Sequence, residues 1–198
     1  NLNTQQPAAT STQTSTPNAI PANTTGMPLA LPSDFAVGIF ARDLDAPRVL
    51  IQDQRGVLLA SIPSQGRVVA LPDGNGDGVT DAVITVANGL GRPHGLSMLC
   101  GDTCTLFIAE EHRVAVFSYN QASHTATFER KLVDLPTGGR HTTRTLQLTG
   151  DKKLLLVSIG SSCDVCREEN EWRGSIISID LATNEARMYA RGLRNAVF

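Results

Sequence analysis

Aromatic residues and charge of one sign are both scarce in this chain of 198 residues. Phe, Trp and Tyr make up 5% of it, and the formal net charge is −2. The near-neutral charge gives no electrostatic reason to expect a nucleic-acid partner. Apolar runs of membrane-span length are missing, and so are amphipathic helical stretches of useful length. These absences disfavour a helical membrane protein, a helical bundle and a nucleic-acid-binding protein.

What the chain does contain is glycine, at 17 residues, and short apolar runs that form pairs. Glycine-bearing turns between short strands are typical of all-β architectures. Equivalent positions in the runs, Leu59, Phe107 and Leu156, are separated by 48 and 49 residues. A period near fifty predicts a β-propeller made of four-stranded blades. The expected strand pairs are Val57–Ala60 with Val68–Leu71, Leu106–Ala109 with Val114–Tyr119, and Leu154–Ile159 with Ser175–Ile179.

The domain organisation follows from composition and length. Residues 1–26 are rich in Thr, Ser, Pro and Gln, and they predict a disordered tether because they cannot bury enough apolar surface to fold. Residues 27–198 are expected to form the propeller, with a first strand over Pro28–Phe40. They provide about three blades, whereas a closed propeller needs at least four. We therefore expect a fragment that is truncated at its C-terminus.

Four cysteines occur as two close pairs, Cys100 with Cys104 and Cys163 with Cys166. Two local disulfides are the favoured interpretation, and they would fit an exported protein. A single zinc site built from both pairs is an alternative, although its ligands usually come from tighter and more similar knuckles. A catalytic thiol pair is a third interpretation, disfavoured because no helix of the thioredoxin type follows Cys166.

Polar residues recur at one position of the repeat, in the turn that leads into each new unit. Because the innermost strands of a propeller begin near its central channel, such turns are expected to assemble one site. His141, in the turn Arg140–Arg144, is a candidate general base. Considered singly, each of these side chains would more often be a surface or strand residue. The three turns are Arg92–Leu96, Arg140–Arg144 and Leu193–Asn195.

Several stretches together resemble the soluble quinoprotein glucose/sorbosone dehydrogenase family, and most closely its L-sorbosone and pyranose dehydrogenase-like members. The family resemblance covers most of the chain after residue 31, in the family's order. It implies a six-bladed propeller that binds pyrroloquinoline quinone (PQQ) and oxidises sugars, of which this chain would be the N-terminal half. The matching stretches are Gly66–Leu71, Gly89–Leu96, Gly139–Leu146, Val157–Cys166 and Gly192–Val197.

The resemblance also implies roles for particular residues. His141 matches the family's general base, which takes a proton from the sugar while hydride passes to the quinone. Arg194 and Asn195 match the pair that contacts the quinone carbonyls, where a guanidinium stabilises developing negative charge. His94 stands where glucose-oxidising relatives have a glutamine. Arg144 lies one place from an arginine of those relatives, and both are expected to contact the cofactor.

A separate metal site is suggested by the turn DGNGDGVTD. Asp73, Asn75, Asp77 and Asp81 offer oxygen ligands at the spacing of the first half of a calcium loop. The closing glutamate of an EF-hand is absent, so a turn without metal is the alternative. The family's own cofactor-associated calcium is expected beyond Phe198.

The sequence therefore predicts an exported quinoprotein that oxidises a sugar or a sorbosone-like aldose, periplasmic or extracellular and with a lipid anchor as one option. Its electrons would pass to an acceptor such as a cytochrome or the quinone pool, and the fragment alone is expected to be inactive. Two alternatives stay open: a catalytically silent propeller that binds a partner, and a lactonase-like propeller hydrolase. The remaining candidates are interpreted as solvated turn residues, namely Glu110, Glu111, His112 and His124, with Trp172 as a packing residue.

Overall fold

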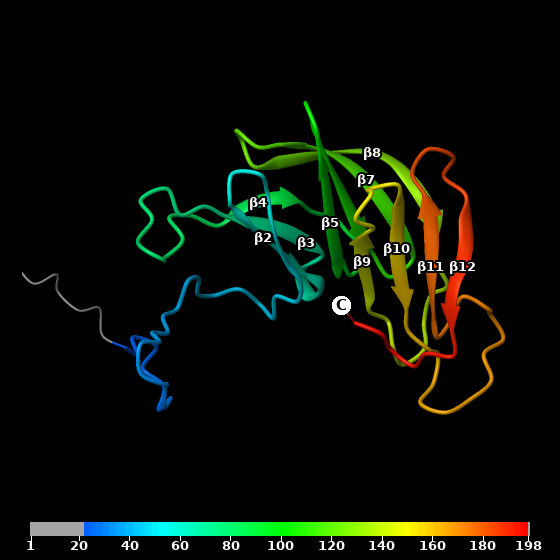
Figure 1. Cartoon of the computed structure of the whole chain (residues 1–198), viewed down its shortest axis with the longest axis horizontal. Helices are drawn as coiled ribbons and strands as arrows, with labels where there is room; N and C mark the ends of the chain where they lie inside the picture. The colour runs from blue at the N-terminus through cyan, green and yellow to red at the C-terminus, as the bar shows by residue number, and fades with distance from the viewer. Residues whose placement is uncertain (1–21, 198) are drawn as a thin grey trace, which may run out of the picture. The chain divides into compact units, whose positions relative to one another are not determined.

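The protein is all-β, with three antiparallel sheets of four strands each (Figure 1). The computed structural model describes residues 22–197. Within them the only helical element is a short 3-10 turn, η1 (Pro63–Gln65). The strands are β1 (Leu50–Gln52), β2 (Leu58–Ile62), β3 (Arg67–Leu71), β4 (Ile84–Ala87), β5 (Gly95–Cys100), β6 (Cys104–Ala109), β7 (Arg113–Asn120), β8 (Thr125–Asp134), β9 (Arg144–Leu148), β10 (Leu154–Ile159), β11 (Ser175–Asp180) and β12 (Ala186–Arg191).

Each sheet is a simple meander in which every strand pairs with the next one along the chain. The first sheet holds β1 to β4, the second β5 to β8, and the third β9 to β12. This is the pattern of propeller blades, and it confirms the predicted fold class with about three blades present. The reference positions Leu59, Phe107 and Leu156 all fall on the second strand of a blade.

Contacts divide the chain into two units, with the boundary after Ile39. All twelve strands belong to the unit that begins at Phe40. In residues 22–39 the only pairing is an isolated parallel bridge between Asn23 and Val37. The strand expected over Pro28–Phe40 is wrong. Pro28 and Pro32 lack the backbone N–H of a ladder, and the chain turns at Asp34, whose φ is +73°.

Residues 1–21 lie outside the described part of the chain, so most of the predicted tether and its boundary at residue 26 stay predictions. A membrane-spanning helix is absent from the described residues, none of which form a helix of the necessary length and hydropathy.

The apolar core fills the spaces between the sheets. Side chains alternate across a strand, so neighbours on β6 face different blades. Leu106 packs into the cluster shared with the first sheet, beside Val68 and Phe117. Phe107 packs into the cluster shared with the third sheet, beside Leu155. The second blade is therefore buried on both faces, and burying each such side chain stabilises the fold by about 1.5–3 kcal/mol.

Both cysteine pairs form local disulfides, as predicted. Cys100–Cys104 closes the hairpin between β5 and β6. Cys163–Cys166 lies in the loop that follows β10. The start of β5 packs against the start of β9, which in turn pairs with the end of β10. Cys100 is at the far end of β5, about 16 Å along the strand at 3.3 Å per residue, so the two pairs do not share one zinc site.

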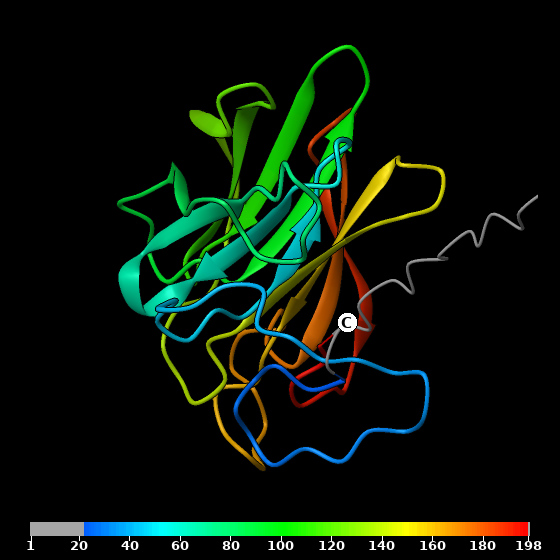
Figure 2. The same cartoon turned by 90° about the vertical axis from the view of Figure 1, so that its left-hand side faces the viewer.

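The strand directions bring the long loops together at one end of the third sheet. Figure 1 shows the loop after β10 (orange) and the segment after β12 (red) at the same end of this sheet. The turn between β9 and β10 (yellow) lies at the opposite end (Figure 2). The end that carries the long loops is called the site face below.

Candidate functional site

The predicted turns before β5 and β9 meet on the site face because the two strands begin side by side. Gly95 opens β5, and a Cβ placed on it would lie 2.5 Å from the carbonyl oxygen of Arg144. Only glycine permits this approach of the two backbones. The preceding residue, His94, consequently lies with its Nδ1 atom 3.1 Å from the same carbonyl oxygen. Adjacent blades are thus joined at their innermost strands.

A hollow of about 480 Å³ opens at this junction, and the turns of all three blades line it. Its cationic and donor groups are Arg48 from the first blade, Arg92 and His94 from the second, and the hydroxyls of Thr142 and Thr143 from the third. None of the residues that line the hollow is acidic. Two guanidinium groups with no lining carboxylate suit an anionic ligand, and PQQ carries three carboxyl groups. The donor set therefore fits the cofactor that the sequence resemblance implies.

His94 is buried at the inner wall of this hollow. Burial lowers the pKa of its imidazole below the usual value of 6.5, and the charges of Arg48 and Arg144 lower it further, while the hydrogen bond to the Arg144 carbonyl opposes them. The ring is therefore neutral at pH 7. A neutral imidazole can donate one hydrogen bond and accept another, which suits contact with a polar ligand group.

His141 lies three residues before β9 and is held by Ser161, two residues after the end of β10. Its Nδ1 atom lies 3.2 Å from the Ser161 carbonyl oxygen and 3.1 Å from the Ser161 hydroxyl. That hydroxyl donates its own proton to the carbonyl of Cys163 at 2.6 Å. Both partners of Nδ1 are therefore acceptors, which places the ring proton on Nδ1. The other nitrogen, Nε2, keeps a free lone pair, as a general base requires.

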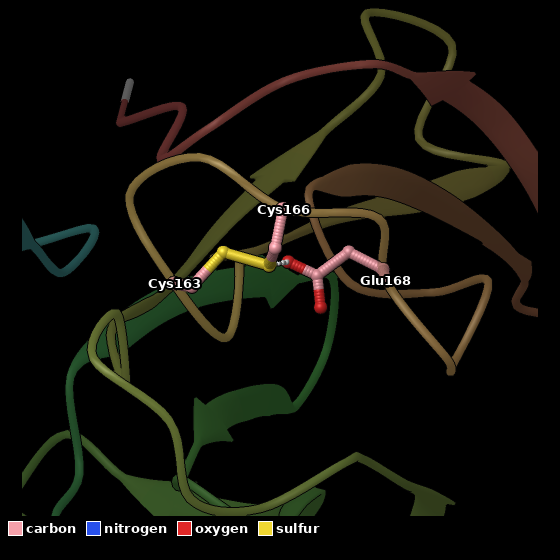
Figure 3. A group of neighbouring side chains, drawn as sticks. All are labelled: Cys163, Cys166 and Glu168. Carbon is pink, nitrogen blue, oxygen red and sulfur yellow. Dashed lines mark hydrogen bonds between the residues drawn. A yellow bond between two sulfur atoms is a disulfide. The ribbon is translucent and has the colours of Figure 1, made fainter.

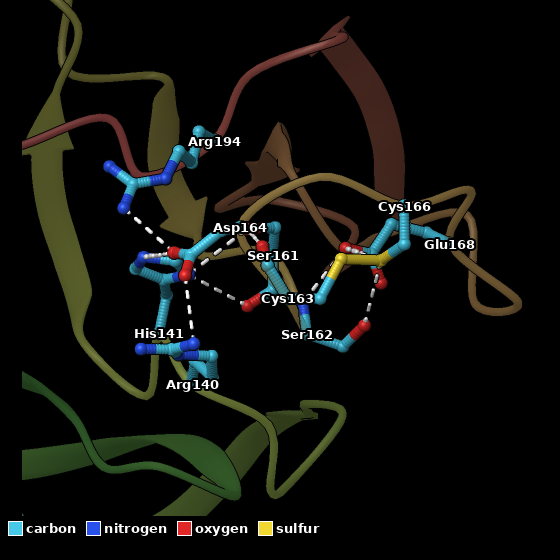
Figure 4. The surroundings of a disulfide bond; sticks show 9 residues. All are labelled: Arg140, His141, Ser161, Ser162, Cys163, Asp164, Cys166, Glu168 and Arg194. Carbon is cyan, nitrogen blue, oxygen red and sulfur yellow. Dashed lines mark hydrogen bonds and ion pairs between the residues drawn. A yellow bond between two sulfur atoms is a disulfide. The ribbon is translucent and has the colours of Figure 1, made fainter.

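The Nε2 atom of His141 faces the carboxylate of Asp164 (Figure 4). It lies 3.6 Å from Oδ1 of Asp164, and the same Oδ1 accepts a hydrogen bond from Nη2 of Arg194 at 2.8 Å. Oδ2 of Asp164 pairs with Nη1 of Arg140 at 2.9 Å. The hydrogen bond from Arg194 holds the pKa of the Asp164 carboxyl below its usual value, and the charge of Arg140 adds to this. Asp164 is thus an ionised centre between two guanidinium groups and one imidazole.

The structure therefore brings His141 and Arg194 together, as the sequence predicts, through a residue that the sequence analysis did not single out. The two side chains come from opposite edges of one sheet, one before β9 and the other after β12, rather than from two blades. Asn195 completes the group, because its Oδ1 accepts a hydrogen bond from Thr143 at 2.9 Å. The roles of these residues toward a cofactor stay predictions.

Arg144 is fully buried. Its position therefore differs from that of a side chain that contacts a cofactor at the protein surface. Its guanidinium donates to the carbonyl oxygens of Pro136, Thr143 and His141, at 2.6, 2.9 and 3.2 Å. Burial lowers its pKa to about 10, which leaves the group charged at neutral pH, and the charge of Arg173 contributes. In this structure Arg144 shapes the backbone that presents His141, and a contact with the cofactor stays a prediction.

The turn from Asp73 to Asp81 uses its acidic groups on its own backbone. Asp73 accepts hydrogen bonds from the N–H groups of Gly76, Asp77 and Gly78, and Asp81 accepts one from Gly74. Across residues 22–197, the turn is not among the places where three potential metal-ligating His, Cys, Asp or Glu side chains converge. Calcium binding at this turn stays a prediction.

The described residues do contain one such convergent group, formed by Cys163, Cys166 and Glu168 (Figure 3). Both of its sulfur atoms belong to the disulfide, so neither is a thiolate that binds a metal. Glu168 instead accepts a hydrogen bond from the backbone N–H of Ser162 at 2.8 Å. The disulfide and this hydrogen bond together hold the loop after β10 in its conformation.

Two functional candidates escaped the sequence analysis, Asp164 and Ser161. The pairing of β9 with β10 would have indicated Ser161, because Arg144 lies opposite Ile159 and the residues just beyond each must then be neighbours, whereas Asp164 lies farther along the loop. A further interpretation is wrong: Glu110 is not solvated but fully buried. It bonds the guanidinium of Arg113 and the backbone N–H of Gly91, and so fixes the turn before β5.

Comparison with known proteins places the chain in a family. A family described as TrAA12-like matches residues 29–197. The chain belongs to this family. None of the curated proteins that were compared matches it. The resemblance to quinoprotein sugar dehydrogenases that the motifs indicated is thereby confirmed at the level of the family, and its solved relatives agree with it.

An AA12 enzyme of Trichoderma reesei, in an iodide structure, is 27% identical with a TM-score of 0.64, over 74% of this chain and 38% of that one. The PQQ domain of pyranose dehydrogenase from Coprinopsis cinerea, in its holo form, is 24% identical with a TM-score of 0.70, over 80% of this chain and 41% of that one. A PQQ-bound aldose sugar dehydrogenase from Streptomyces coelicolor shares the fold at 16% identity and a TM-score of 0.54, over 72% and 46%. The chain thus spans about two fifths of the length of the first two.

Proposed function

We propose that the protein is a quinoprotein oxidoreductase that binds PQQ on the site face and oxidises a sugar. The observation that carries this proposal is the arrangement of His141, whose proton is held on Nδ1 by Ser161 while Nε2 stays free beside Asp164. Membership of the TrAA12-like family and the cationic hollow beside this histidine support it. PQQ, when bound, would supply the two-electron acceptor for hydride from the sugar carbon.

The residues of this chain would then supply binding and proton transfer. Arg48 and Arg92 would hold the anionic groups of the cofactor through charge-assisted hydrogen bonds. His94 donates its Nδ1–H to the Arg144 carbonyl, so its Nε2 atom would accept a hydrogen bond from a donor group of the cofactor. Nε2 of His141 would take the proton of the sugar hydroxyl, and the imidazolium formed would face the Asp164 carboxylate at 3.6 Å. Arg194 and Asn195 would lie beside the quinone oxygens, where a guanidinium stabilises developing negative charge.

The finer points of the proposal concern substrate, partners and location. The substrate class is a cyclic sugar or a sorbosone-like aldose, with calcium as a further ligand of the full-length protein and a cytochrome or the quinone pool as electron acceptor. Two disulfides support a periplasmic or extracellular location, with a lipid anchor as the proposed attachment. Residues 1–198 alone are proposed to be inactive, because the other blades would complete the cofactor site.

A lactonase-like hydrolase is the weaker enzyme alternative. Such an activity needs acidic metal ligands around the central hollow, and the residues that line it here include no carboxylate. A silent binding module is distinguished from the enzyme by experiment.

The test is reconstitution of the full-length protein with PQQ and calcium, followed by sugar oxidation with a dye acceptor. The unchanged protein should bind PQQ and turn over sugar. His141→Gln should lose at least about 100-fold in kcat, the usual contribution of a general base, while PQQ still binds with its absorbance shift. His124→Gln, in the turn between β7 and β8, is the matched control and should keep full activity. PQQ binding without turnover would favour the silent module, and unchanged turnover by His141→Gln would remove this residue from the mechanism.

A further inference from the structure

We propose that Asp164 is a positioning residue that aligns the general base His141 with the guanidinium of Arg194, and that the Cys163–Cys166 disulfide holds Asp164 in place. The inference rests on the proposed function for its catalytic consequence. Its structural part, the control of Arg194 by Asp164, can be tested without any cofactor.

A single carboxylate oxygen carries the connection between the two side chains. Oδ1 of Asp164 lies 2.8 Å from Nη2 of Arg194 and 3.6 Å from Nε2 of His141. The side chain of Arg194 is 63% exposed and that of His141 only 13%. An exposed arginine has many rotamers of similar energy, so the ion pair selects the one that points back toward the imidazole. Figure 4 shows the three groups converging.

The loop that carries Asp164 is fixed on both sides of this residue. The disulfide closes a loop of four residues around Asp164, from Cys163 to Cys166. Before it, the hydroxyl of Ser161 donates to the carbonyl of Cys163 at 2.6 Å, and the backbone N–H of Arg140 donates to the carbonyl of Ser162 at 2.9 Å. The carboxylate is thereby presented by a short, cross-linked segment that is tied to the loop of the general base.

This arrangement has a chemical consequence for both partners. When Nε2 of His141 takes up a proton, the positive charge lies 3.6 Å from the Asp164 carboxylate. The same carboxylate leaves the other N–H groups of the Arg194 guanidinium free, because Arg has five donors in a fixed planar fork. One anion thus orients a base and a cation that would act on the same substrate–cofactor pair, without touching either reacting atom.

The first experiment measures the orientation of Arg194 in the protein without cofactor. Phenylglyoxal reacts with arginine side chains, and the rate at Arg194 is followed by peptide mass spectrometry. Asp164→Asn should raise that rate about threefold, which is the size expected for loss of one exposed ion pair. Glu185→Gln is the matched control, because it removes a carboxylate that also pairs with one exposed arginine, Arg187, at 2.7 Å, although Glu185 is 62% exposed and Asp164 41%. It should speed the reaction of Arg187 alone.

The second experiment measures kinetics of the reconstituted full-length protein. Asp164→Asn should lower kcat at least about tenfold, as a loosened catalytic geometry does, with little change in the KM for sugar or in melting temperature. Asp164→Glu, which keeps the charge, should recover part of kcat, and Glu185→Gln should keep all of it. Cys163→Ser with Cys166→Ser should reproduce both effects of Asp164→Asn.

The outcomes separate the two proposals. An unchanged reaction rate of Arg194 in Asp164→Asn overturns the positioning role, whatever the activity. A raised rate with an unchanged kcat overturns the catalytic consequence. If the unchanged full-length protein shows no PQQ-dependent oxidation, the proposed function fails, while the rate at Arg194 still decides whether Asp164 orients it.

Discussion

Gly160 and His141 approach so closely that no side chain fits between them. A Cβ placed on Gly160 would lie 2.5 Å from the Cβ of His141 and 2.6 Å from its carbonyl oxygen. Gly160 directly follows β10, opposite the segment that leads into β9. The absence of a side chain at this position lets the histidine lie against the strand end, where Ser161 holds its Nδ1 atom.

Substitution of Gly160 should therefore disturb the general base itself. In Gly160→Ala the added methyl group must push His141 away, and we expect kcat of the reconstituted protein to fall at least about tenfold, because a displacement near 1 Å can cost that much or more. Gly150→Ala, in the turn between β9 and β10, is the control because its Cβ would meet no atom within 4 Å. Equal kcat values for the two variants would show that the close approach has no functional weight.

Burial of His94 predicts a dependence of stability on pH. Its folded-state pKa lies below 6.5, so below pH 6.5 the unfolded chain takes up a proton that the folded protein resists. The free energy of unfolding should fall as the pH drops from 6.5 through the folded-state pKa, by about 1.4 kcal/mol for each unit of pKa difference. Urea unfolding at pH 7.5 and pH 5.0 measures it. His94→Gln should lose this part of the dependence, and parallel curves for the two proteins would contradict the prediction.

The two disulfides should differ in their resistance to a dithiol reductant. Cys166 is exposed, whereas Cys104 is 3% exposed and lies between paired strands. Mild reduction should therefore open Cys163–Cys166 first, as alkylation and mass spectrometry would show. Sugar oxidation should decline in step, by about tenfold, because Asp164 loses its fixed loop. The control variant Cys100→Ser with Cys104→Ser should be active before reduction and should lose activity at the same reductant concentration as the unchanged protein. Activity that survives opening of Cys163–Cys166 would refute the proposed dependence of activity on this disulfide.

The parts of the fold that the sequence predicts are those that repeat. Dense apolar runs bounded by glycine indicated the second and third strands of each blade, because such strands are buried on both faces. The common phase of the three polar turns indicated a shared site, and His94, His141 and Arg194 do lie on one face. The outer strands β8 and β12 were not predicted, because their exposed residues lack a continuous apolar pattern.

The parts that the sequence does not predict depend on contacts that occur once and do not recur from blade to blade. Asp164 belongs to a long loop whose path is set by a disulfide and by side-chain hydrogen bonds, so no spacing identifies it. Glu110 and Arg144 are charged residues beside turns, and charged residues are mostly exposed. Their burial follows from partners that only the fold supplies, which are Arg113 for the glutamate and three carbonyl oxygens for the arginine.

The segment after β12 is fastened to the blade that it leaves. The N–H of Leu193 donates to the carbonyl of Gly174, and the carbonyl of Arg194 accepts from the N–H of Ser161, both at 2.8 Å. The hydrogen bonds that set the distance between the His141 imidazole and the Arg194 guanidinium thus all belong to the third sheet and its loops. Contacts between neighbouring strands form early when a chain folds, so we expect this pair to be in register as soon as the third blade closes, before its neighbours have docked.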